Sequence, residues 1–158
     1  MSKKKQLAIQ NFIEACKLAE PNSSVYIGSD SQRFKTKEGF KARYATVLIL
    51  HMGSKHGGKL FHWTDEQADY GGLKQRLLNE VGYAIDAFEH IVDTIIEYDL
   101  PVEIHLDLNQ SPLHKSNIAV KEACGWVLGV TGVEAVLKPG AFAAAHAADH
   151  LVRNKPLH

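Results

Sequence analysis

The chain of 158 residues is organised around one short stretch, residues 25–32, which reads Val-Tyr-Ile-Gly-Ser-Asp-Ser-Gln. Its apolar start indicates a central β-strand, and Asp30 stands at or near the carboxyl end of that strand. A carboxylate at the end of a buried strand is held on a rigid element, as a metal ligand or a proton-transfer group requires. The Ser-Asp-Ser sequence also suits an exposed turn. By itself, Asp30 leaves both interpretations open.

Composition is that of an ordinary globular protein, with 45% hydrophobic and 23% charged residues. The length is sufficient for one hydrophobic core, and no repeat or low-complexity linker divides the chain, which predicts a single domain over residues 1–158. The formal net charge is zero. Because no global positive field attracts nucleic acid or an anionic membrane, a nucleic-acid partner needs a local basic patch.

Cysteine usage and the N-terminus both indicate a cytoplasmic protein. Cys16 and Cys124 lie far apart in apolar helical contexts, which is typical of reduced buried thiols. The basic residues 3–5 are not followed by the apolar segment of a signal peptide. No apolar run is long enough to span a bilayer, so we expect no membrane partner. The sequence leaves the oligomeric state open.

Hydrophobic periodicity predicts an N-terminal helical extension over residues 1–21 and a core over residues 22–154. The first three strands are expected to form an antiparallel meander, with a charged loop over residues 33–41, and Ser116 and Gly129 are expected to cap and stop the second core helix. The predicted elements are helix 6–19, strands 25–31, 43–51 and 59–63, helix 73–98, strand 102–108, helix 117–128, strand 133–137 and helix 141–153.

The order of the core elements, β-β-β-α-β-α-β-α, predicts an α/β fold of the ribonuclease-H-like layout. That layout is a mixed five-stranded sheet flanked by helices. Four acids fall on four elements that converge near the centre of such a sheet: Asp30, Glu80, Asp107 and Asp149. Carboxylate oxygens are the ligands that Mg²⁺ and Mn²⁺ prefer. A pair of such ions about 3.5–4 Å apart can activate water and stabilise the leaving oxygen in phosphodiester cleavage.

The sequence resembles the YkuK-like family of ribonuclease-H-related proteins, long described as a domain of unknown function. The resemblance covers about residues 22–154. It rests on residues 27–32, 76–80, 104–107, 137–139 and 147–149. It implies that Asp30, Glu80, Asp107 and Asp149 fall on the acidic positions of the family, as catalytic residues and metal ligands. The same fold also hosts inactive and repurposed members.

Four further residues are expected to contact the substrate: Ser31, Gln32, Lys138 and His146. Ser31 and Gln32 directly follow Asp30. Lys138 stands before a turn and can contact a phosphate, or it is an exposed loop lysine. His146 shares a helical face with Asp149 and can shuttle a proton or help release product, or the two form a surface pair.

Each candidate acid has a structural alternative. Asp107 can instead cap the turn over residues 109–111. Glu89 rivals Glu80, because the two flank opposite sides of the apolar stripe on the long helix; Glu80 is favoured as nearer the start of the helix, and either can be a solvated surface residue. His105 shares the face of Asp107 and is either a neighbour of the site or a packed core histidine.

Two functions follow from the sequence. The first is a nuclease that uses Mg²⁺ or Mn²⁺, two ions being expected, to cleave a nucleic acid (RNA, DNA or a hybrid). The second is a non-catalytic ribonuclease-H-like module that binds nucleic acid or a protein. The charged segment 33–41, with Phe34 and Phe40 among its basic residues, is either a nucleic-acid surface or a solvated hairpin loop. Actin-like ATPases share the sheet topology but need two such domains, which 158 residues cannot supply.

Overall fold

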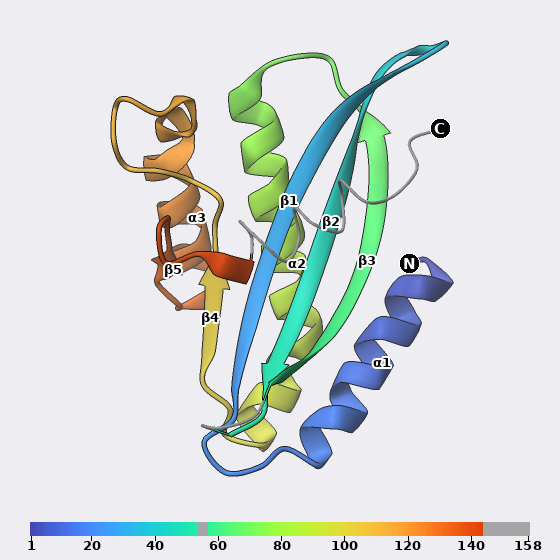
Figure 1. The fold of residues 1–158 in the computed structure, drawn as a ribbon, viewed down its shortest axis with the longest axis vertical. Helices are drawn as coiled ribbons and strands as arrows, with labels where there is room; N and C mark the ends of the chain where they lie inside the picture. Colours follow the sequence, from blue (N-terminus) through green and yellow to red (C-terminus); the bar gives the residue numbers. More distant parts are fainter. Residues whose placement is uncertain (54–56, 144–158) are drawn as a thin grey trace.

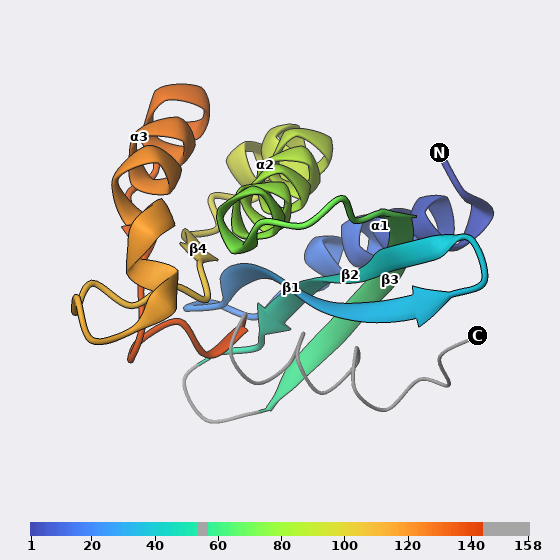
Figure 2. The ribbon, with the colours of Figure 1, turned by 90° about the horizontal axis from the view of Figure 1, so that it is seen from above.

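A computed structural model of the protein describes residues 1–53 and 57–143. In this part of the chain, one mixed β-sheet carries the α-helices on one of its faces (Figures 1 and 2). In chain order the elements are α1 (Lys3–Lys17), β1 (Ser24–Thr36), β2 (Gly39–His51), β3 (Gly58–Ala68), α2 (Leu73–Glu97), β4 (Val102–His105), the 3-10 helix η1 (Lys115–Ala119), α3 (Val120–Thr131) and β5 (Ala135–Val136).

The strands are arranged in the order β3-β2-β1-β4-β5. β1, β2 and β3 form an antiparallel meander, whereas β4 pairs parallel with β1, and β5 pairs parallel with β4. Parallel neighbours need long connections, and α2 and α3 supply the ones that precede β4 and β5. The predicted α/β fold with a mixed five-stranded sheet is therefore confirmed.

The charged loop predicted over residues 33–41 is wrong. β1 runs to Thr36 and β2 begins at Gly39, so a tight turn joins two long paired strands. Thr36 Oγ1 donates a hydrogen bond to the Gly39 carbonyl at 2.6 Å and closes the turn. Charged residues made this segment look like a loop, but the pairing of β1 with β2 satisfies its backbone groups, and Phe34 is buried.

Three strand boundaries also differ from the prediction. β3 continues to Ala68, through residues predicted as a polar connection from Thr64, because it pairs residue by residue with β2. β4 ends at His105 rather than at Leu108, and β5 is confined to Ala135–Val136. Strand length is set here by the available partner strand and not by the local hydrophobic pattern.

The second core helix ends later than expected. α3 passes through Gly129 and stops at Gly132, which has a φ of 74° and so occupies the left-handed conformation that favours glycine at a helix end. Ser116 is not the helix cap that the sequence predicts. It lies inside η1, and its Oγ accepts a hydrogen bond from the backbone N–H of Asn109 at 2.9 Å.

The apolar core lies between the sheet and the helices and includes the N-terminal helix. Phe12 of α1 is fully buried, and its ring meets the ring of Phe61 edge-on with 5.6 Å between the centroids. Ile9 and Cys16 belong to the same cluster. Both cysteines are free, and Cys16 is buried while Cys124 is partly buried.

Gly82 in the middle of α2 has a packing role. A Cβ at this position would lie 3.0 Å from the Trp126 ring of α3. The missing side chain therefore lets α3 approach α2 closely, and the helix continues without interruption from Leu73 to Glu97.

The predicted last helix, 141–153, falls almost wholly outside the described residues. Only residues 141–143 belong to the described chain, whereas His146 and Asp149 do not. Among the helices that the structure describes, none combines the length and the apolar character needed to cross a membrane.

Candidate functional site

The candidate site lies where β1 loses its parallel neighbour. β4 pairs with β1 only as far as Gly28 and His105, while β1 continues to Thr36. Beyond Gly28, no strand of the described chain pairs with this edge of β1. Side chains at an uncovered strand edge can approach one another from both faces of the sheet.

Glu80 reaches this edge from α2. Its side chain is only 6% exposed, and its Oε2 accepts a hydrogen bond from Ser31 Oγ at 2.5 Å. Glu89, the rival acid on the same helix, is exposed. Of the two glutamates, Glu80 is therefore the one that the fold turns toward β1.

The environment of Glu80 strongly disfavours its charged form. The pKa of its carboxyl is raised from the ordinary 4.5 to about 8, mainly by burial and to a smaller extent by the negative charge of Asp107. The hydrogen bond from Ser31 and the positive charges of Arg76 and Lys138 lower the pKa. Without an added cation, Glu80 therefore keeps its proton near neutral pH. Such strongly shifted carboxyls concentrate at functional sites.

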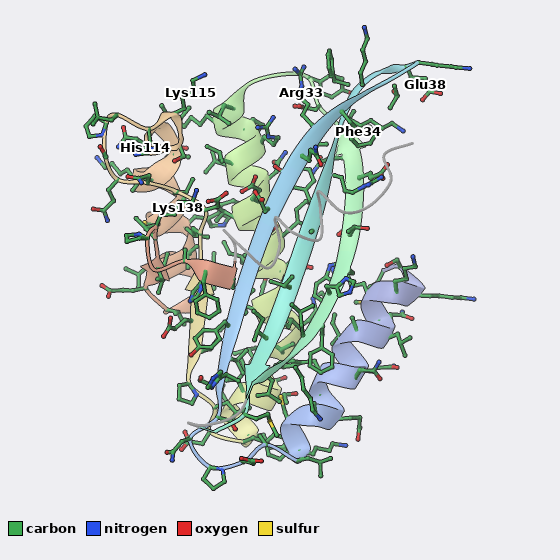
Figure 3. All side chains as sticks on the ribbon, viewed as in Figure 1. Arg33, Phe34, Glu38, His114, Lys115 and Lys138 are labelled. Atoms are coloured by element: carbon green, nitrogen blue, oxygen red, sulfur yellow. The ribbon has the colours of Figure 1, made fainter. Side chains whose placement is uncertain are left out.

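Asp107 and Lys138 complete this group of side chains. Lys138 Nζ lies 2.5 Å from Asp107 Oδ1, and the Asp107 side chain is 19% exposed. We call Ser31, Glu80, Asp107 and Lys138 the carboxylate cluster. Figure 3 shows Lys138 on the side of β1 where α3 lies. In this cluster a lysine ammonium supplies the positive charge next to two acids.

Asp30 lies next to the cluster in the chain but on the other face of the sheet. Because successive side chains of a strand alternate, Asp30 points away from the face on which Ser31 meets Glu80. It pairs across β1 and β2 with Ala45, which packs with Ala143. Asp30 is 6% exposed.

The β1–β4 register nevertheless relates Asp30 to Asp107. Gly28 is opposite His105, so the same register continued by two residues would set Asp30 opposite Asp107. Gln32 shares the face of Asp30, and its Oε1 is buried without a hydrogen-bond partner among the described residues. Two oxygen-bearing side chains therefore occupy the face opposite Glu80.

Arg76 is the site residue that sequence reasoning misses. It precedes Glu80 by one helical turn on α2, and its positive charge lowers the pKa of Glu80. The i, i+4 spacing of a basic and an acidic residue on one helix is the signal that could have found it. The resemblance of residues 76–80 to the YkuK-like family assigns a role to Glu80 and none to Arg76.

His105 is a packed core histidine. It is fully buried, and its ring packs against the rings of both Tyr26 and Phe142, which also contact each other. The backbone N–H of Ala143 donates to Nδ1 at 3.1 Å, so Nε2 carries the proton and donates to Glu103 Oε1 at 2.9 Å. Burial lowers the pKa of His105, against the opposing effect of Glu103. His105 thereby ties residue 143 to the sheet.

The predicted ligand set is only partly assembled in the described chain. Glu80 and Asp107 interact electrostatically, Asp30 is on the other face, and Asp149 and His146 lie outside the described residues. Within residues 1–53 and 57–143, no three His, Cys, Asp or Glu side chains are grouped so that they could hold a metal ion.

Comparison with known proteins gives a family. The sequence matches the family model described as "Ribonuclease H-like" over residues 6–153. No curated protein matches it significantly. Among solved structures it is similar to the native prototype foamy virus protease–reverse transcriptase, at 11% identity and a TM-score of 0.47. The match covers 85% of this chain and 20% of that chain. Since the family model spans most of the sequence, the chain belongs to the ribonuclease H-like family.

Proposed function

We propose that the protein is a divalent-metal-dependent nuclease of the YkuK-like branch of the ribonuclease H-like family. The observation that carries this proposal is the carboxylate cluster. A buried glutamate with a pKa of about 8 lies beside a second acid whose partner is a lysine ammonium. Glu80 and Asp107 can both be ionised only when positive charge lies close to them, because neighbouring negative charges repel. A hard divalent cation supplies that charge.

The donor set fits Mg²⁺ or Mn²⁺. Asp30, Glu80, Asp107 and Asp149 would hold the ions, two being expected, since all four offer carboxylate oxygens. When bound, such ions supply Lewis-acid stabilisation and an activated water for phosphodiester hydrolysis. The uncovered edge of β1 supports a shared site, because acids from opposite faces can meet around an edge that no described strand covers.

The remaining site residues are proposed to hold the nucleic acid and orient the acids. Ser31 fixes the Glu80 carboxylate through its 2.5 Å hydrogen bond. Gln32 has a buried amide oxygen on the same face of β1 as Asp30. Lys138 is proposed to exchange its contact with Asp107 for a contact with a substrate phosphate, and His146 is proposed to act beside Asp149.

The proposed activity is tested with the Asp30→Asn variant. Removing one ligand carboxylate is expected to reduce cleavage by about 10²–10³-fold, the range for losing one electrostatic group at a reaction centre. The assay measures cleavage of RNA–DNA hybrid, single-stranded and branched substrates with Mg²⁺ or Mn²⁺. Asp93→Asn, which changes an exposed acid of α2, is the matched control and should keep wild-type activity. Equal inertness of wild type and Asp30→Asn on every substrate would refute the nuclease.

Lys138 is expected to compete with the metal for Asp107. Replacing it with methionine removes a positive charge 2.5 Å from Asp107 Oδ1. Calorimetry should then show Mn²⁺ binding severalfold more tightly, because a partly exposed ion pair contributes up to about 1 kcal/mol. Lys121→Met on the exposed surface of α3 is the control. Unchanged or weaker Mn²⁺ binding by Lys138→Met would mean that the lysine does not compete with the ion.

A non-catalytic nucleic-acid-binding or protein-binding module is the second candidate. The placement of Asp30 and Glu80 on opposite faces favours it, because a module that holds no ion has no need to bring its acids together. Calorimetry with millimolar Mn²⁺ separates the two functions. Heat of binding and a raised melting temperature support the nuclease, whereas neither effect would support the module.

A further inference from the structure

Positive charge is concentrated at the far end of the β1–β2 ribbon. We call residues 33–43 the basic arm. It contains five basic residues and one acid, a net charge of about +4, in a chain whose formal net charge is zero. The rest of the chain therefore carries about −4. The local basic patch that a neutral protein needs to attract nucleic acid is present in this one segment.

The base of the basic arm is held by contacts on both faces of the ribbon. On one face, the Arg33 guanidinium lies 3.7 Å from the centroid of the Phe40 ring and Arg33 Nε lies 2.7 Å from Asp69 Oδ2. On the other face, Arg43 lies over Phe34 at 5.5 Å and binds Glu66 Oε2 through Nε and Nη2, at 3.1 and 2.9 Å. The two arginines are occupied in holding the arm to the end of β3 and the residues that follow it.

The lysines of the arm remain available. Lys35 and Lys37 are exposed and Lys41 is partly exposed. None of the three forms an ion pair with an acid in the described part of the chain. Together with Thr36 and Glu38 they line an open hollow of about 700 Å³. A cluster of ammonium groups without acidic partners on a paired β-hairpin suits an anionic polymer.

The arm and the carboxylate cluster are joined by one strand. β1 carries Asp30 and Ser31, and then continues to Thr36 at the tip. Six residues of extended chain span about 20 Å, which is roughly the length of six base pairs. Figure 3 shows Arg33 and Glu38 toward the end of this ribbon, away from Lys138. A nucleic acid that lies along β1 could therefore contact the site and the arm together.

The aromatic surface that the arm exposes is limited to one ring. Phe34 is only 7% exposed, and Phe40, which is 41% exposed, has the Arg33 guanidinium against one side of its ring. Binding of single strands relies on stacking of bases on open aromatic faces. The arm presents ammonium groups instead, and these contact phosphates without reading sequence.

We propose that the basic arm binds the sugar-phosphate backbone of a duplex nucleic acid through Lys35, Lys37 and Lys41. The proposal rests on the proposed function, since it places the adjoining part of the same duplex at the carboxylate cluster. Recognition is through charge and shape and is independent of base sequence.

The test is a triple variant, Lys35→Gln with Lys37→Gln and Lys41→Gln, compared with a matched triple variant of exposed lysines elsewhere, Lys3→Gln with Lys4→Gln and Lys59→Gln. Fluorescence anisotropy measures binding of a labelled duplex and of a single strand of the same length, in EDTA and over a range of salt concentrations. For the arm variant we expect duplex affinity to fall at least tenfold. The slope of log K against log salt should decrease by about 0.9 for each phosphate that the variant no longer neutralises.

Duplex binding with wild-type affinity and salt slope in the arm variant would overturn the proposal. So would an equal loss of affinity in the control variant, or tighter binding of the single strand than of the duplex by the wild type. The nuclease is judged separately, by cleavage in Asp30→Asn. Arm-dependent duplex binding without any cleavage would refute the nuclease alone, and cleavage without arm-dependent binding would refute the arm alone.

Discussion

Replacing Glu80 with glutamine is expected to raise the melting temperature at pH 8 by roughly 5–10 °C in the absence of divalent cations. The folded protein holds Glu80 with a pKa of about 8, whereas an exposed glutamate in the unfolded chain has a pKa near 4.5. Ionising the buried carboxyl therefore costs stability. A difference of one pKa unit between the folded and unfolded states is worth about 1.4 kcal/mol, and the weaker hydrogen bond from Ser31 to an amide offsets part of the gain.

The pH dependence has a definite sign. Between pH 4.5 and 8 the folded state binds more protons than the unfolded state at this position, so stability falls as pH rises. The difference in melting temperature between wild type and Glu80→Gln should be close to zero at pH 4 and largest at or above pH 8. Thermal unfolding followed by circular dichroism across this range measures it.

Glu89→Gln is the matched control, because Glu89 is an exposed acid on the same helix. It should change the melting temperature by less than about 1 °C at either pH. Millimolar Mn²⁺ should raise the melting temperature of the wild type but not of Glu80→Gln, since the ion needs the charged carboxylate. If Glu80→Gln melts at or below the wild-type temperature at pH 8, ionisation of the buried Glu80 carboxyl does not destabilise the folded protein as its burial implies.

Truncating Phe12 to alanine is expected to reduce the free energy of unfolding by about 3–5 kcal/mol, as is typical for a buried phenylalanine. Phe12 is fully buried and packs edge-on against Phe61 of the sheet. Loss of the ring would leave a cavity between α1 and the sheet. We propose that α1 belongs to the same domain as the sheet, so this loss should destabilise the whole chain in one cooperative transition.

Leu7→Ala is the control for Phe12→Ala, because Leu7 lies on the same helix and is 58% exposed. Its effect should stay within about 0.5 kcal/mol. Urea unfolding followed by fluorescence and by circular dichroism measures both variants. A loss of α1 at low urea with the rest of the transition unchanged would contradict the proposal of one domain.

Most of the fold could be predicted from local patterns. The apolar stripe of α2 repeats every 3.6 residues. The helix begins at Leu73 in the structure, which is the start that the sequence predicts. The alternation in β4 and the apolar run in β2 likewise mark strands. These elements follow from the burial of periodic apolar residues, which is visible in the sequence.

The basic arm could not be predicted in this way. Its charged residues favour a loop on local grounds, but Arg33 and Arg43 are stacked on phenylalanines that lie across the hairpin in the partner strand. The end of α3 is a second example. Gly129 and Gly132 look equivalent in sequence, and only the path of the chain toward β5 requires the left-handed conformation at Gly132.

The sequence by itself determined the order of the elements, the mixed α/β sheet and the choice of candidate acids, because periodic burial and residue chemistry are local properties. Only the tertiary structure decided how those acids are placed. It turned Glu80 rather than Glu89 toward β1 and paired Lys138 with Asp107, and it set Asp30 on the opposite face from Glu80. The reason is geometric. The pairing register and the alternation of side chains along a strand fix which face each side chain occupies, and its burial there then shifts its pKa.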